Sequence, residues 1–241
     1  MLSGPLAIVT GAGHRIGKAF AHTLARNGYA ILLHYWTSEA EATATERELA
    51  GLGADVFLCR ADLTEEHGVA DLFAEADEIS RPLKVLVNSA GILRAGDPRT
   101  LSAQEWDETL DLNLRAPFLC AREAASRMDQ GGLIVNVTDV GARKSWSRFP
   151  AYSVSKAGLE ALTSILARAF APAIRVNAIA PGLTLRSKLV TDEEWQRLVD
   201  RLPLKRVASV DEIASALDFL LKNEYVTGQT LVIDGGYSLL G

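Results

Sequence analysis

The chain has 241 residues, of which 48% are hydrophobic and 23% are charged, and its formal net charge is −5. This composition is typical of a globular protein with one large core, so we expect a single domain over residues 1–241. The acidic balance provides no broad basic surface for a phosphate backbone, which argues against nucleic-acid binding.

Short apolar runs alternate with amphipathic helical patterns along the whole chain. The apolar runs predict strands at residues 5–10, 30–35, 55–59, 84–88, 133–137, 174–179 and 230–233. Helices are predicted at residues 16–27, 38–51, from 64 onward, 101–128, 152–170, and from 191 and 209 onward. Repeated alternation of strand and helix indicates an α/β, doubly wound parallel sheet with helices on both faces.

Three of the predicted helix starts have the spacing of a capping box. Ser38, Thr191 and Ser209 are each followed three residues later by a glutamate. In a capping box the hydroxyl accepts from the third backbone N–H of the helix, and the glutamate accepts from the capping residue. We therefore expect each hydroxyl to cap its own helix.

Cysteine and histidine usage gives no sign of a metal site. Cys59 and Cys120 form neither a ligand pair nor a disulfide framework, and a reducing setting suits them. Four scattered histidines lack ligand spacing and are expected to be surface or capping residues: His14, His22, His34 and His67. No segment approaches the ~20 apolar residues of a membrane span, so we expect a cytoplasmic protein that is neither secreted nor membrane-bound.

The turn between the first strand and the first helix is rich in glycine and reads Thr10-Gly-Ala-Gly-His-Arg-Ile-Gly17. Gly11 and Gly17 allow a tight turn and close backbone approach. The start of the following helix offers N–H groups and a positive dipole to a pyrophosphate. Since ligands of doubly wound sheets bind at the carboxyl ends of the strands, this turn is a candidate nucleotide site.

A second candidate site is Tyr152-Ser-Val-Ser-Lys156. Residues four apart in a helix lie on one face, so the phenol and the ammonium can project toward the same point. A neighbouring cation lowers the pKa of tyrosine and makes Tyr152 a plausible general acid. The alternative is an exposed tyrosine and lysine at helical spacing.

Together, the glycine turn and the Tyr152–Lys156 pair resemble the short-chain dehydrogenase/reductase family over the whole chain. Further matching stretches are Asp62-Leu63, Asn88-Ser-Ala-Gly91, Asn113, the Val-Asn-Val-Thr138 strand end, Pro181-Gly182 and Val232-Ile-Asp-Gly-Gly236. The resemblance implies a Rossmann-type fold and a nicotinamide dinucleotide cofactor. Taken singly, Asp62 could begin a loop, Asn113 could bend a helix, and Pro181-Gly182 could end a strand.

The resemblance also implies roles for individual residues. Asp62 and Leu63 flank the adenine, Asn88 to Gly91 line the cofactor cleft, and Asn113 holds a water that relays protons to Lys156. Lys156 also binds the nicotinamide ribose. The other expected cofactor contacts are His14, Arg15, Ile16, Tyr35, Thr37, Ser38, Ala90, Thr138, Pro181, Gly182 and Leu183.

Two departures from the common family pattern are similar to pteridine reductases and dihydromonapterin reductases. Arg15 stands where most of the family has glycine, and Asp139 stands where most has serine. Further similar stretches are His34-Tyr35, Ser38-Glu-Ala-Glu-Ala42, Trp195 and Asp234-Gly-Gly-Tyr-Ser238. Leu93 departs from this subgroup, which places an aromatic near that position to stack on the pterin.

Asp139 suits the reduction of a C=N bond better than that of a ketone. A carboxylate repels the oxyanion that forms in ketone reduction, whereas a carboxyl group beside Tyr152 can carry a proton to nitrogen. The alternative is that Asp139 caps a turn or pairs with Arg143 or Lys144. The basic and aromatic loop at residues 143–149 could grip an anionic or planar substrate, but we expect it to be solvated or to contact another subunit.

The expected cofactor is NADPH, because residues 29–38 contain no acidic side chain to bond a ribose 2′-hydroxyl. Thr37 and Ser38 can donate to a 2′-phosphate, although Ser38 can equally cap its helix.

The expected substrate is a dihydropterin, held by Arg15, Leu93, Asp139, Tyr152 and Trp195. The alternatives are a ketone or 3-oxoacyl reductase and, in another class, a non-catalytic dinucleotide sensor. The presence of both Tyr152 and Lys156 argues against the sensor.

The helix that carries Tyr152 has a strip of small residues at Ser155, Gly158 and Ala161. We expect another helix to approach along this strip. The family resemblance adds the expectation of a homotetramer.

Overall fold

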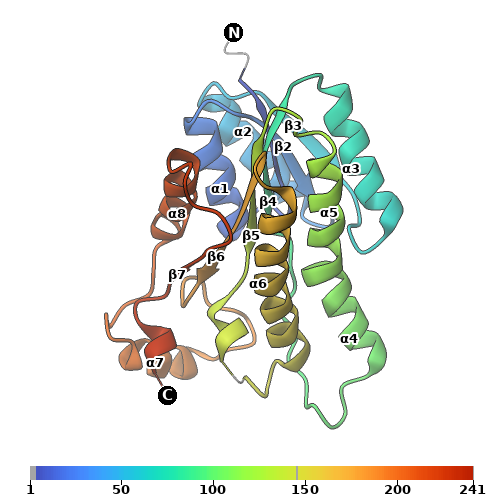
Figure 1. The fold of residues 1–241 in the computed structure, drawn as a ribbon. Helices are drawn as coiled ribbons and strands as arrows, with labels where there is room; N and C mark the ends of the chain where they lie inside the picture. The colour runs from blue at the N-terminus through green and yellow to red at the C-terminus, as the bar shows by residue number, and fades with distance from the viewer. Residues whose placement is uncertain (1–3, 145, 241) are drawn as a thin grey trace.

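In the computed structural model, which describes residues 4–144 and 146–240, seven strands form one sheet (Figure 1). The strands are β1 Leu6–Val9, β2 Ala30–Tyr35, β3 Val56–Arg60, β4 Leu83–Asn88, β5 Gly132–Val137, β6 Ile174–Pro181 and β7 Thr230–Ile233. Their order is β3-β2-β1-β4-β5-β6-β7, and every neighbouring pair is parallel. The strand order therefore reverses between β1 and β4, where a ligand is expected.

Helices cover both faces of the sheet, which confirms the predicted doubly wound architecture (Figure 1). One face carries α1 Arg15–Arg26, α2 Glu39–Gly51 and α8 Val210–Lys222. The other carries α3 Glu66–Glu78, α5 Ala116–Ala125 and α6 Pro150–Phe170. The helices α4 Ala103–Leu110 and α7 Asp192–Arg201 lie toward the end of the molecule opposite the N-terminus.

The alternation of strand side chains produces two separate hydrophobic cores. Leu6 and Ile8 of β1 join the core under α3, α5 and α6, whereas Ala7 and Val9 join the core under α1, α2 and α8. All four side chains are fully buried. Strands buried on both faces read as continuous apolar runs, which is why their positions were predictable.

The predicted helix at residues 101–128 is interrupted. A π-helical segment, Asp111–Arg115, separates α4 from α5 and carries the buried Asn113. Such segments keep the chain helical, so the apolar pattern alone gave no sign of the break. Because the π-helical turn holds one extra residue, it shifts which side chains face the sheet.

The capping predictions have mixed outcomes. Thr191 and Ser209 form the predicted capping boxes, and Ser102 forms a third with Glu105 that was not predicted. The prediction for Ser38 is wrong, since within the described structure its side chain makes no capping hydrogen bond. The Ser38 hydroxyl instead packs against the glycine turn, because a Cβ on Gly13 would lie 2.9 Å from Ser38 Oγ.

The small-residue strip of α6 mostly faces its own protomer. The Ser155 hydroxyl donates to the Tyr152 carbonyl at 2.7 Å and accepts from Asn113 Nδ2 at 3.2 Å. A Cβ on Gly158 would lie 2.9 Å from Leu114 Cδ2. At these two positions the neighbouring helix is thus the π-helical segment of the same chain, whereas the outer face of α6 exposes Val154, Ala161 and Ile165.

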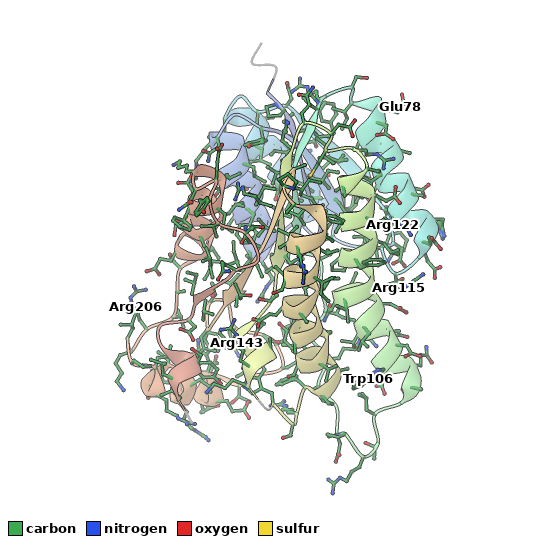
Figure 2. The ribbon with its side chains drawn as sticks, in the orientation of Figure 1. Glu78, Trp106, Arg115, Arg122, Arg143 and Arg206 are labelled. Atoms are coloured by element: carbon green, nitrogen blue, oxygen red, sulfur yellow. The ribbon has the colours of Figure 1, made fainter. Side chains whose placement is uncertain are left out.

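Ion pairs connect α3 with α5 and with the turn that follows it, and Figure 2 labels Arg122 among the side chains on the outside of the molecule. Arg127, just after α5, donates from Nε to Asp77 Oδ1 of α3 at 2.8 Å, and Arg122 Nη2 lies 3.7 Å from Glu66 Oε1. These pairs are largely exposed, so each contributes little stability. None of the helices in the described ranges is long and apolar enough to cross a membrane.

Candidate active site

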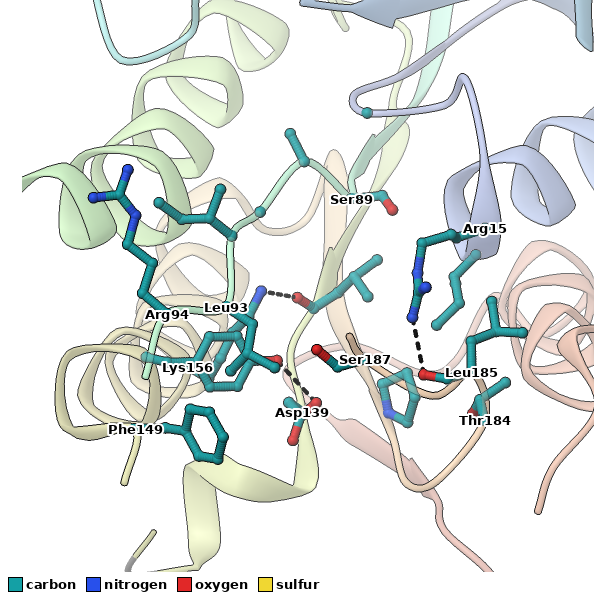
Figure 3. A pocket seen from close by; sticks show the side chains of 18 of the residues that line it. Arg15, Ser89, Leu93, Arg94, Asp139, Phe149, Lys156, Thr184, Leu185 and Ser187 are labelled. Carbon is teal, nitrogen blue, oxygen red and sulfur yellow. Dashed lines mark hydrogen bonds between the residues drawn. The ribbon is translucent and has the colours of Figure 1, made fainter. Parts of the chain in front are cut away.

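A cavity of about 1260 Å³ opens at the carboxyl ends of the strands (Figure 3). Segments that follow β2 and β3 line one side, and segments that follow β5 and β6 line the other. The predicted residues that line it are Gly11, His14, Arg15, Ile16, Tyr35, Thr37, Ser38, Asp62, Leu63, Ala90, Gly91, Leu93, Thr138, Asp139, Tyr152, Lys156, Pro181, Gly182, Leu183 and Trp195. The sheet therefore brings together residues from across the whole sequence.

The glycine turn is packed closely against the segment that follows β4. Gly11 has a φ of +63°, and a Cβ there would lie 2.8 Å from Ala90 Cα. The Thr10 hydroxyl accepts hydrogen bonds from the backbone N–H groups of Ser89 and Ala90, both at 3.0 Å. A side chain at residue 11 would therefore separate the two segments that form the cleft.

The start of α1 fits the pyrophosphate of a dinucleotide. Within the described structure His14 makes no capping hydrogen bond, so the first N–H groups of α1 have no side-chain acceptor. Gly11, His14, Arg15, Ile16 and Gly17 line the cavity at this point. Backbone N–H groups at a helix start, together with the helix dipole, favour an anion, so the arrangement is compatible with the expected pyrophosphate contact.

Arg15 is held in a left-handed conformation, with a φ of +56°, where most side chains are strained. Its guanidinium donates from Nη2 to the carbonyl oxygen of Leu185 at 2.9 Å (Figure 3). This bond links the glycine turn to the segment that follows β6. Arg15 lines the cavity as predicted, but one of its N–H groups is engaged by the protein itself.

Tyr152 and Asp139 form the central contact of the site (Figure 3). The Tyr152 hydroxyl donates to Asp139 Oδ2 at 2.9 Å, and Asp139 Oδ1 accepts from the Gly141 N–H at 2.6 Å. Asp139 therefore does cap a turn, as one alternative proposed, while it also contacts the phenol. The other alternative, that Asp139 pairs with Arg143 or Lys144, is wrong. Arg143 bonds Glu160, and Lys144 donates to the Leu240 carbonyl.

The acid–base state of this pair differs from the prediction. Burial raises the pKa of Tyr152 well above its ordinary value, and the charge of Asp139 and the hydrogen bond to it raise that pKa further. Burial also raises the pKa of Asp139, although the Gly141 N–H opposes the rise. The expectation that Lys156 would lower the pKa of Tyr152 is therefore wrong for this chain, since the carboxyl group lies closer to the phenol.

Lys156 is buried behind Tyr152 and donates from Nζ to the carbonyl oxygen of Val137 at 2.8 Å. Its Nζ lies 5.8 Å from the centre of the Tyr152 ring. Burial lowers the pKa of Lys156 to about 8, against the opposing charge of Asp139. The ammonium therefore stays charged at neutral pH and can lose its proton slightly above it.

Asn113 and Asn88 lie behind the cavity and not in its lining. Asn113 accepts from the Ile92 N–H and donates to the Ile92 carbonyl, both at 2.9 Å, and so holds the segment that carries Gly91. Asn88 donates to Asn136 Oδ1 at 2.9 Å, which joins β4 to β5. Unlike Ala90 and Gly91, Asn88 therefore does not line the cavity as expected.

Three aromatic residues that were not among the expected site residues also line the cavity. Trp146, Phe149 and Tyr237 line the cavity together with the predicted Trp195. The Trp146 ring lies 6.1 Å from that of Phe149 and 6.2 Å from that of Tyr237. The loop expected to be solvated thus forms a cavity wall, because it packs against the C-terminal segment, a long-range contact without a local sequence signal.

The histidine predictions were wrong for His34, which is buried and lines the cavity. In the described part of the chain, no three His, Cys, Asp or Glu side chains gather as they would around a metal ion. Cys59 and Cys120 are buried free thiols.

Known proteins resemble this chain over nearly its whole length. The family model described as enoyl-(acyl carrier protein) reductase matches residues 11–238. The 3-oxoacyl-[acyl-carrier-protein] reductase FabG of Staphylococcus aureus is 34% identical and covers 95% of this chain and 96% of its own length. A short-chain type dehydrogenase/reductase of Picea abies is 32% identical and covers 98% of this chain and 93% of its own length.

A solved structure is similar in both fold and sequence. FolM alternative dihydrofolate reductase 1 from Brucella canis, complexed with NADP, has a TM-score of 0.93 and 34% identity. The match covers 100% of this chain and 96% of the other.

We predict that Asp139→Ser lowers the pKa of Tyr152. The negative charge of Asp139 and its hydrogen bond both favour the protonated phenol, so their removal makes the proton easier to lose. The pKa of Lys156 should also fall, because the same charge raises it. Carbon-13 NMR of labelled tyrosine over a pH series measures the change, with Tyr152→Phe to assign the signal. Asp97→Ser, an exposed position paired with Arg99, is the control. An unchanged pKa of Tyr152 would contradict the prediction.

Proposed function

Since the chain belongs to the short-chain dehydrogenase/reductase family, we propose that it is an NADPH-dependent reductase of a dihydropterin. The observation that carries this proposal is the hydrogen bond between Tyr152 and a partly buried Asp139. Further support comes from FolM alternative dihydrofolate reductase 1, which shares the fold and was crystallised with NADP.

The chain's own residues bind and orient the cofactor. The glycine turn and the start of α1 hold the pyrophosphate, and Asp62 and Leu63 border the adenine. Asp62 Oδ1 also accepts from the Thr64 N–H at 3.0 Å, which fixes the orientation of its carboxylate. Lys156 is placed to bond the nicotinamide ribose, and a bound NADPH supplies the hydride.

The proton comes from the pair of Tyr152 and Asp139. When hydride adds to the carbon of a C=N bond, the nitrogen must receive a proton. Burial raises the pKa values of both groups, which favours their protonated forms inside the cavity. Tyr152 thus donates directly, or Asp139 carries the proton when it is neutral. We propose that Lys156 returns a proton to Tyr152 after the reaction, and that Asn113 helps to hold a water that relays protons to Lys156.

Although Leu93 is aliphatic, Trp146 offers an aromatic surface that the planar ring of a substrate can contact. Trp146 lies against Gly141, since a Cβ on Gly141 would be 2.6 Å from the Trp146 ring. The turn that holds the Asp139 carboxyl therefore also holds the indole. Loss of one stacking partner costs about 0.5–1.5 kcal/mol, and we propose that Trp146 replaces the aromatic that is missing at Leu93.

The alternative function is reduction of a ketone or a 3-oxoacyl group. It is favoured by the relatives, which include the 3-oxoacyl-[acyl-carrier-protein] reductase FabG. Asp139 opposes it, because a carboxylate beside the developing oxyanion raises the barrier. The pair of Tyr152 and Lys156 also argues against a non-catalytic dinucleotide sensor.

The buried free thiols suit the reducing cytoplasm, where we propose that the enzyme works.

We predict tighter binding of NADPH than of NADH. Thr37 and Ser38 line the cavity after β2, and Ser38 is not used as a helix cap. The Arg60 guanidinium lies 5.0 Å above the Trp36 ring and brings positive charge to the same segment. A 2′-phosphate gains charge-assisted hydrogen bonds there. Dissociation constants from fluorescence titration measure the preference, and equal or tighter binding of NADH would refute it.

We predict that wild type reduces a dihydropterin with NADPH and that Asp139→Ser lowers this rate by about 10²-fold, because a proton source is lost. The same variant should lower the rate of simple-ketone reduction by a smaller factor. Tyr152→Phe, the matched control, should lower both activities by about 10²-fold while NADPH affinity changes little. If ketones react well, dihydropterins do not, and Asp139→Ser is harmless, the enzyme is a carbonyl reductase.

We also propose a homotetramer in which the outer face of α6 is an interface. Val154 and Ile165 are exposed on α6, and Phe118 is exposed on α5. A partner helix on this face would hold the helix of Tyr152 in place from behind. Ile165→Glu should therefore weaken assembly and activity together, as measured by light scattering and initial rates. A fully active monomer would disprove the link.

A further inference from the structure

His34 is a buried histidine in the cavity wall that the proposed reaction does not use. It lies on β2, is 2% exposed, and sits between the glycine turn and the end of β3. A histidine inside an otherwise apolar strand must have partners for both ring nitrogens, because an unpaired buried polar group costs stability.

Both ring nitrogens contact backbone groups of neighbouring segments. Nδ1 accepts from the Gly11 N–H at 3.1 Å, and Nε2 lies 2.9 Å from the carbonyl oxygen of Ala61. Since a carbonyl oxygen only accepts, Nε2 carries the proton and Nδ1 carries the lone pair. The backbone carbonyl of His34 also accepts from the Ala12 N–H at 3.0 Å. The imidazole is therefore in one tautomer and bridges two segments.

The two bridged segments border the same half of the cavity. Gly11 begins the turn that leads to the pyrophosphate site, and Ala61 directly precedes Asp62 and Leu63. We propose that His34 is a positioning residue. Its neutral side chain bridges these two segments, sets the distance between them and thereby shapes the site for the adenosine and pyrophosphate. This inference rests on the family's nicotinamide cofactor and is independent of the dihydropterin proposal.

Both hydrogen bonds of His34 form only while the ring is neutral, because an imidazolium has no lone pair to accept from the Gly11 N–H. Burial lowers the pKa of His34 to about 4, although the Ala61 carbonyl and the charge of Asp62 raise it slightly. At neutral pH the ring is therefore uncharged and both contacts are available.

Three substitutions separate the two contacts. His34→Leu removes both, whereas an amide side chain of suitable length can restore one of them. Asparagine places its oxygen near the position of Nδ1, and glutamine places its nitrogen near the position of Nε2. The expected order of cofactor affinity is wild type, then the Asn and Gln variants, then Leu.

The test measures dissociation constants for NADPH and NADH, together with kcat at saturating cofactor. His34→Leu should weaken binding of both cofactors by about tenfold or more. The factor should be the same for both, because His34 positions the segments around the adenosine and pyrophosphate, which NADPH and NADH share. The Asn and Gln variants should lose less, and kcat should be within about twofold of wild type. His67→Leu, an exposed position on α3, is the control and should bind as wild type does.

Three outcomes would overturn the inference. The first is a folded His34→Leu variant, verified by circular dichroism, that binds NADPH as tightly as wild type. The second is a loss confined to NADPH, which would mean that His34 acts through the 2′-phosphate. The third is a fall in kcat with unchanged cofactor affinity. If the Leu variant does not fold, the Asn and Gln variants must still show weaker cofactor binding at unchanged kcat.

Discussion

A partly buried carboxyl group that accepts a hydrogen bond from a phenol imposes the main constraint on the substrate end of this protein. Charge on either group is unfavourable there, because neither water nor an adjacent cation compensates it fully. Lys156 lies nearby, but its ammonium is directed to the Val137 carbonyl. The site therefore favours the protonated forms of Asp139 and Tyr152, which suits a reaction that consumes a proton at nitrogen.

The position of this pair depends on polar contacts inside the protein. Asn136 of β5 donates from Nδ2 to the Thr163 hydroxyl of α6 at 2.9 Å, while its own oxygen accepts from Asn88 of β4. These three side chains are buried, so their hydrogen bonds specify one register between the helix and the sheet. Tyr152 and Lys156 lie on the same helix, and Asp139 follows β5 directly. Asn88, which was expected to contact the cofactor, therefore supports the site through its hydrogen bond to Asn136.

Local pattern was enough to predict the alternation of strands and helices, because both faces of the sheet are covered and the strands are uniformly apolar. Most of the expected cavity lining came instead from the resemblance to the short-chain dehydrogenase/reductase family, since local pattern pointed only to the glycine turn and the Tyr152–Lys156 pair. Contacts between distant segments were not predictable. Ser38 has the spacing of a cap but packs against Gly13, and His34 has the context of a core strand but bonds Gly11. Trp146 lies 6.2 Å from Tyr237, a residue more than ninety positions along the chain.

The glycine turn is fixed from several directions by hydrogen bonds within the protein itself. Ser89 and Ala90 donate to the Thr10 hydroxyl, His34 accepts from Gly11, and the Thr45 hydroxyl donates to the Gly13 carbonyl at 2.9 Å. Ordering a flexible residue costs about 1–2 kcal/mol of conformational entropy. Because folding has already ordered this turn, that entropy is lost before the encounter, and the affinity for a dinucleotide is not reduced by it.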